Sequence, residues 1–92
     1  MRPRARVEVG DAAGWYEGQR VGLGIRFLDE LDHVFTRDQL DPLQCPEFDP
    51  GVRRGLLRKF PYSVYFSVAV SSIEVIAVLH QQRHPDTWKG RK

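Results

Sequence analysis

Residues 62–71 alternate between two sets of side chains, which is the pattern of a β-strand with one buried face. The apolar or aromatic set is Tyr62, Val64, Phe66, Val68 and Val70, and the intervening set is Ser63, Tyr65, Ser67, Ala69 and Ser71. The intervening side chains, Tyr65 among them, are therefore expected on the polar face of this strand.

Two neighbouring segments extend this strand into a sheet. Ser71 and Ser72 predict a tight turn, after which Ile73–His80 is apolar at almost every position and is expected to be a central strand. Val52–Phe60, ended by Pro61, is expected to be a third strand that carries several basic side chains. The three strands predict an antiparallel meander at about residues 52–80.

The N-terminal third carries helical periodicity instead. Two apolar stripes have helical spacing, namely Ala5, Val9, Ala12, Ala13 and Tyr16, then Leu23, Phe27, Leu31, Val34 and Phe35. The short break at 19–22, with its glycine, predicts a turn between two antiparallel helices. Trp15 and Tyr16 lie at the end of this hairpin, and both are expected to pack in the core or in the hairpin.

These elements predict a single α+β domain in which a helical hairpin packs on a three-stranded antiparallel sheet. The hairpin spans about residues 3–37, a proline-rich loop about 38–51, the meander about 52–80, and a basic tail 81–92. The helices are expected to cover one sheet face. The other face, carrying arginine and tyrosine side chains, is expected to be left for a partner.

Composition and local sequence pattern argue against a membrane helix, a signal peptide and a cysteine metal site. The longest uninterrupted apolar run is Val75–Leu79, far shorter than the roughly 20 residues of a membrane helix. The N-terminus is basic but lacks the apolar stretch of a signal peptide. Cys45 is the one cysteine, which indicates a reducing cytoplasmic setting, with no nearby histidine or second cysteine to suggest a metal site.

Charge is distributed unevenly along the chain. Residues 1–50 hold six arginines and ten acidic residues, a balance of −4, whereas residues 51–92 hold eight basic and two acidic residues, a balance of +6. A basic half on a small domain suggests an anionic partner, either nucleic acid or an acidic protein segment.

Several short motifs, taken in order, are similar to those of a known family. They are Ala12-Ala13-Gly14-Trp15-Tyr16, Gly22-Leu23-Gly24 with Phe27-Leu28, Pro50-Gly51-Val52-Arg53-Arg54, Leu57-Arg58-Lys59-Phe60-Pro61-Tyr62, and Ala77-Val78-Leu79-His80 with Arg83-His84-Pro85 and Trp88. Over about residues 3–91 the chain resembles ParE-like toxins of the RelE/ParE superfamily, the plasmid stabilisation proteins of toxin–antitoxin pairs. The resemblance implies a strand before the helical hairpin, and Met1-Arg2-Pro3 stands where that strand should end. We therefore expect either that the strand is truncated or absent or that the true start of the protein lies upstream.

The resemblance implies two alternative activities. ParE-like toxins poison DNA gyrase by binding it, whereas RelE-like toxins cleave messenger RNA on the ribosome. RNA cleavage needs a base, a phosphate-binding cation and an acid, for which Arg58, Arg83 and His80 are the candidates. The nuclease branch generally carries a C-terminal tyrosine, which residues 88–92 lack, so the ParE-like activity is the preferred prediction.

The predicted partners are a cognate antitoxin, in a hetero-oligomer with the toxin, and DNA gyrase, or alternatively the ribosome and mRNA. No cofactor, metal or membrane is implied. The residues expected to bind the target or the antitoxin are basic or aromatic, namely Arg53, Arg54, Arg58, Lys59, Tyr65, Arg83, His84 and Trp88. A further alternative, a degenerate non-toxic binding module, is suggested by the missing strand, which would leave a sheet edge unpaired.

Overall fold

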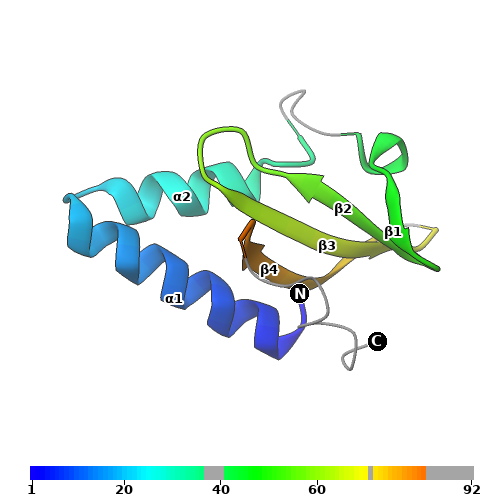
Figure 1. Ribbon diagram of the computed structural model, residues 1–92, viewed down its shortest axis with the longest axis horizontal. Helices are drawn as coiled ribbons and strands as arrows, with labels where there is room; N and C mark the ends of the chain where they lie inside the picture. Colours follow the sequence, from blue (N-terminus) through cyan, green and yellow to red (C-terminus); the bar gives the residue numbers. More distant parts are fainter. Residues whose placement is uncertain (37–40, 71, 83–92) are drawn as a thin grey trace.

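The computed structural model describes residues 1–36, 41–70 and 72–82, in which two helices precede an antiparallel sheet (Figure 1). The helices are α1 (Pro3–Gln19) and α2 (Leu23–Asp32), followed by a short 3-10 turn, η1 (Pro42–Gln44). The strands are β1 (Glu47–Asp49), β2 (Val52–Leu56), β3 (Tyr62–Val68) and β4 (Ile73–His80), in the spatial order β1-β2-β3-β4. The α+β class predicted from the sequence is confirmed, with one strand more than predicted.

The additional strand, β1, lies in the segment that the sequence predicts to be a loop. Pro46 and Pro50 flank it and keep it short, and Gly51, at φ 77°, makes the tight connection to β2. β2 ends at Leu56 rather than at Phe60, and residues 57–61 turn the chain into β3, closed by the Leu57 amide donating to the Tyr62 carbonyl at 3.0 Å. We call residues 57–61 the β2–β3 turn.

A side chain of α1 caps the start of α2. The Glu17 carboxylate accepts hydrogen bonds from the backbone amides of Gly22 and Gly24, each at 3.0 Å, which satisfies donors that a helix N-terminus leaves without intrahelical partners. Gly22 adopts φ 89°, and a Cβ built on Gly24 would lie 2.6 Å from the Ala13 carbonyl oxygen. The two helices therefore meet so closely that only glycine fits at position 24.

The helical stripes pack on one face of the sheet, as the sequence predicts. Ala5, Val9, Ala12 and Tyr16 of α1, and Phe27 and Leu31 of α2, are all buried. Four rings, those of Tyr16, Phe27, Phe60 and Tyr62, form an aromatic cluster with centroids 4.8–6.1 Å apart. This cluster joins the helical hairpin to the β2–β3 turn, and aromatic pairs at such distances add stabilisation beyond the area that they bury.

Trp15 departs from the expectation made for it. Its side chain is 61% exposed, and it contacts Tyr16 edge to face with ring centroids 5.1 Å apart. Tyr16 is buried in the aromatic cluster, as expected, whereas the packing predicted for Trp15 is wrong. The reason is helical geometry, because consecutive residues lie about 100° apart around the axis and only one of the pair can face the core.

The opposite face of the sheet is not open, which corrects the prediction of an uncovered basic surface. A second buried cluster contains Val52, Tyr65, Ile76, Ala77 and Leu79, with the partly buried Phe48 packed against it. Tyr65 is only 3% exposed, so the expectation that it projects from a polar face is wrong. The alternation in β3 marks two chemically different faces, yet both faces are buried along residues 63–66.

β4 lies at the edge of the sheet. This corrects the prediction from its apolar sequence, which was a central strand. α1 lies along its outer side (Figure 1), where the Val78 amide donates to Glu8 Oε1 at 3.1 Å and the Arg2 amide donates to the Val75 carbonyl at 3.0 Å. Burial on both faces and cover at the edge explain why this strand reads as central.

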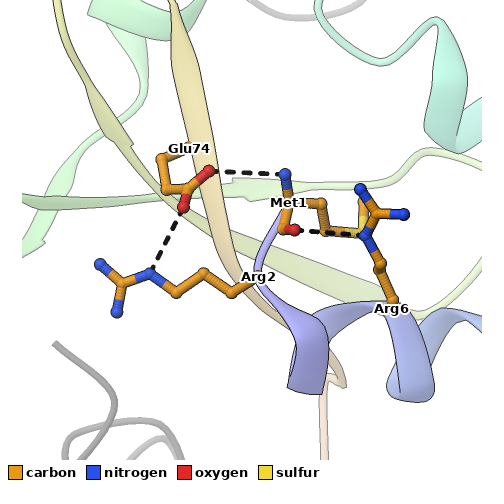
Figure 2. A network of polar contacts seen from close by, with 4 residues as sticks. All are labelled: Met1, Arg2, Arg6 and Glu74. Atoms are coloured by element: carbon orange, nitrogen blue, oxygen red, sulfur yellow. Dashed lines mark hydrogen bonds and ion pairs between the residues drawn. The ribbon is translucent and has the colours of Figure 1, made fainter.

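Polar contacts hold the beginning of α1 against β4 (Figure 2). The Glu74 carboxylate pairs with the Met1 amino group at 3.4 Å and with Arg2 Nε at 3.6 Å, and Arg6 Nε donates to the Met1 carbonyl at 3.3 Å. Exposed pairs of this kind contribute little stability. Within residues 1–36, the chain enters α1 at Pro3 without a preceding strand.

Candidate functional site

Arg53 and Arg54, both predicted to bind a partner, point to opposite faces of the sheet. The register places Arg53 opposite Phe66 and Arg54 opposite Tyr65. Arg53 Nη1 donates to the carbonyls of Cys45 at 2.7 Å and Leu43 at 3.3 Å. It therefore fastens the segment around η1 to the sheet.

Arg54 lies over the ring of Phe48, with its guanidinium carbon 4.7 Å from the ring centroid. Phe48 in turn meets Tyr65 edge to face at 5.6 Å. A guanidinium at this distance from an aromatic face is attracted to the ring. The two arginines thus have structural contacts on different faces, so they do not share the one arginine-bearing face that the sequence predicts.

Arg58 and Lys59 do come together, at a hollow between α2 and the β2–β3 turn. Its volume is about 540 Å³, and the side chains that line it are Leu23, Arg26, Asp29, Glu30, Arg58, Lys59 and Phe60. We call it the α2-turn hollow. Its cations come from two segments distant in sequence, α2 and the β2–β3 turn.

Glu30 is a buried residue in the lining of this hollow. The residue is only 9% exposed, and its Oε2 accepts hydrogen bonds from the backbone amides of Arg58 at 2.9 Å and Lys59 at 3.2 Å. Hydrogen bonds to an ionised acceptor are stronger than neutral ones. Glu30 therefore fixes the backbone of the β2–β3 turn to α2, so that the side chains of Arg58 and Lys59 extend from an anchored turn.

The balance of charge in the hollow favours an anionic group. The hollow has three basic side chains, those of Arg26, Arg58 and Lys59, and two acidic ones, those of Asp29 and Glu30. The Glu30 carboxylate already accepts two amide hydrogens. Leu23 and Phe60 add apolar wall, which suits an amphipathic protein segment better than a free phosphate. The charged and apolar side chains that line it can supply contacts to such a segment.

His80 lies elsewhere, at the end of β4. Its Nδ1 lies 3.1 Å from the Gln82 amide and accepts that hydrogen, and its ring meets Tyr62 edge to face at 5.3 Å. It lines a different hollow, beside α1, and Arg58 does not contribute to that hollow. The proposed nuclease residues Arg58 and His80 are thus not brought together, and Arg83, His84 and Trp88 lie outside the described residues.

Burial raises the pKa of two groups in the core. The pKa of the Cys45 thiol is raised chiefly by burial and also by Asp41, with Arg53 acting in the opposite direction. Burial, with a contribution from Tyr62, raises the pKa of the Tyr16 phenol. Both groups therefore keep their protons at neutral pH, and the Cys45 thiol has the character of a structural residue. Within the part of the chain that the structure describes, no three potential metal-ligating side chains meet.

Arg26 and Glu30, which complete the hollow, were not predicted from the sequence. Glu30 stands three residues after Phe27 and next to Leu31, at the border of the apolar stripe, and this was the available signal that it might be buried. Arg26 carried no distinguishing signal, because an exposed arginine on a helix is ordinary.

The comparisons with known proteins provide no relative. A scan against protein-family models gives no match, and searches of curated proteins and of solved structures give none either. Among the described residues, no helix has both the length and the apolar character needed to cross a bilayer.

Proposed function

We propose that this chain is the toxin of a toxin–antitoxin pair, a cytoplasmic ParE-like protein that inhibits DNA gyrase by binding it and is neutralised by a cognate antitoxin. The resemblance in sequence motifs is the starting point. The observation that carries the proposal is the α2-turn hollow, where Arg26, Arg58 and Lys59 line a cavity together with the apolar Leu23 and Phe60, beside a turn that Glu30 anchors.

This hollow suits an acidic, amphipathic protein segment. Such a segment would place carboxylates against the guanidinium groups, whose planar geometry matches them, and apolar side chains against Leu23 and Phe60. An antitoxin segment or an acidic surface of the target has this chemistry. The nuclease alternative gains no support from the geometry, since Arg58 and His80 line separate hollows.

The test is DNA supercoiling by purified gyrase in the presence of the purified chain. Inhibition at micromolar concentration is expected, and it should weaken by about tenfold or more in the double variant Arg26→Glu with Lys59→Glu, because like charges would then face an acidic partner. The matched control is Arg4→Glu, an exposed arginine of α1 outside the hollow. Full supercoiling at micromolar wild-type protein would refute the proposal.

A further inference from the structure

A second hollow lies between α1 and β4, and its chemistry is opposite to that of the α2-turn hollow. Its volume is about 260 Å³, and Glu8, Asp11 and Trp15 of α1 face Tyr62, Val78 and His80 across it. We call it the α1–β4 groove. Among the described residues that line it, the formally charged ones are both acidic, although the chain as a whole is basic.

Helical geometry brings the acidic and aromatic side chains to one wall of the groove. Glu8, Asp11 and Trp15 stand at i, i+3 and i+7, so they share a face of α1 adjacent to the face that packs in the core. This wall is held in register with the sheet, because Glu8 Oε1 accepts the Val78 amide hydrogen at 3.1 Å. Two carboxylates and one indole ring are thus presented by a fixed helix.

Trp15 is the aromatic side chain of the groove that is exposed enough to meet a ligand. Trp15 is 61% exposed, and its edge-to-face contact with Tyr16 uses little of its surface. Across the groove, the rings of Tyr62 and His80 pack edge to face at 5.3 Å. The His80 Nδ1 accepts the Gln82 amide hydrogen at 3.1 Å, which fixes the orientation of its ring.

We propose that the α1–β4 groove binds an arginine or lysine side chain from a basic segment of a partner protein. A cation placed there would be attracted both by the carboxylates and by the face of an aromatic ring, and tryptophan is the strongest of the rings in this role. A phosphate backbone would meet Glu8 and Asp11, whose charge repels it, so nucleic acid is a poorer occupant. This proposal is independent of the proposed gyrase inhibition, which uses the other hollow.

The test is the binding of fluorescein-labelled decapeptides, measured by anisotropy with the full chain at low and high salt. The probes are an alternating Arg-Gly peptide and an alternating Glu-Gly peptide of the same length. We expect the arginine peptide to bind, to weaken as salt is raised, and to shift the Trp15 indole N–H signal in heteronuclear NMR spectra. The glutamate peptide should not bind.

Variants then place the binding site. Asp11→Asn together with Trp15→Ala should weaken binding of the arginine peptide by about tenfold or more, since both attractions are lost. Asp32→Asn, an exposed acid of α2 outside the groove, removes a similar charge and should change affinity by less than about twofold. Circular dichroism and thermal unfolding will establish that the variants are folded.

Three results would overturn the proposal. Equal weakening by Asp32→Asn would mean that the peptide responds to overall charge and not to the groove. An unmoved Trp15 signal at saturating peptide would place the binding elsewhere. A Trp15 signal that shifts with protein concentration alone, without peptide, would show that a second copy of the chain occupies the groove. Gyrase inhibition is measured separately, so failure of either proposal leaves the other standing.

Discussion

The Glu30 side chain links two elements that are distant in sequence. It comes from α2, is almost fully buried, and binds the backbone amides of Arg58 and Lys59 in the β2–β3 turn. Burial of a carboxylate costs folding free energy unless its oxygens are hydrogen-bonded, and these two amides donate the hydrogen bonds. The position of the Arg58 and Lys59 side chains in the α2-turn hollow therefore depends on the hydrogen bonds of one buried acidic residue.

Substitution of Glu30 should destabilise the fold in a graded way. Glu30→Ala loses both charge-assisted hydrogen bonds and leaves two amides without this partner, so the free energy of unfolding should fall by about 2–4 kcal/mol. Glu30→Gln retains a neutral acceptor and should cost about 1–2 kcal/mol. Urea unfolding of the purified variants measures both values.

Asp29→Asn provides the control for Glu30, because Asp29 lines the same hollow but is exposed. It should change the free energy of unfolding by less than about 0.5 kcal/mol. Equal losses for Asp29→Asn and Glu30→Gln would contradict the role assigned to the buried carboxylate.

The Cys45 thiol predicts a dependence of stability on alkaline pH. Its pKa is raised in the folded chain, chiefly by burial, so the unfolded chain loses this proton first as the pH rises past the ordinary thiol pKa of about 8.5. The unfolded state is then favoured, and stability falls with increasing pH until the folded thiol also ionises. Cys45→Ser removes this ionisation, so its unfolding free energy should fall less steeply between about pH 8 and 10. Parallel slopes for the two proteins would count against this account.

At the scale of elements, the closeness of α1 and α2 depends on Gly24. A methyl group there would meet the Ala13 carbonyl oxygen at 2.6 Å and the Glu17 carboxylate oxygen at 3.0 Å. Gly24→Ala should therefore force the helices apart and lower the free energy of unfolding by about 1–3 kcal/mol. Thermal and urea unfolding will measure the change.

Gly10→Ala is the matched control, since Gly10 lies within α1 with no atom within 4 Å of an added Cβ. There alanine only restricts the unfolded chain and improves helix propensity, so stability should rise by about 0.5–1 kcal/mol. Opposite signs are expected for the two glycines. Destabilisation by Gly10→Ala as large as that by Gly24→Ala would contradict the close-approach argument.

Periodicity in the sequence predicted which segments form helices and strands better than it predicted which other segments cover them. The stripes that include Val9, Tyr16, Phe27 and Leu31 are buried, because local spacing alone decides which face of a helix is apolar. The exposed face assigned to Tyr65 and the central place assigned to β4 were wrong. Both depend on which other segments cover a strand, and a pattern within the strand does not contain that information.

The candidate site was predicted only in part, for a similar reason. Arg58 and Lys59 stood out because they are adjacent cations in one segment, whereas Arg26 and Glu30 join them only when α2 packs beside the β2–β3 turn. Arg53 and Arg54 look equivalent in sequence, yet the pleat of β2 sends them to opposite faces. Tertiary packing thus selects which basic residues share a surface.

For the whole molecule, charge is sorted between two hollows that flank the aromatic cluster. Phe60 of the cluster lines the basic α2-turn hollow, and Tyr62 of the same cluster lines the acidic α1–β4 groove. A small net charge of +2 therefore conceals two hollows whose charged side chains differ in sign balance.

The most direct test of the central claim is bacterial growth during induced expression of the chain, with plasmid supercoiling followed in the same cells. We expect growth arrest with loss of negative supercoiling for the wild type and for Arg4→Glu. Near-normal growth is expected for Arg26→Glu with Lys59→Glu at equal protein level, because the charge of the α2-turn hollow is reversed. Growth arrest that persists undiminished in this double variant, or arrest with unchanged supercoiling, would rule out the proposed inhibition of gyrase through this hollow.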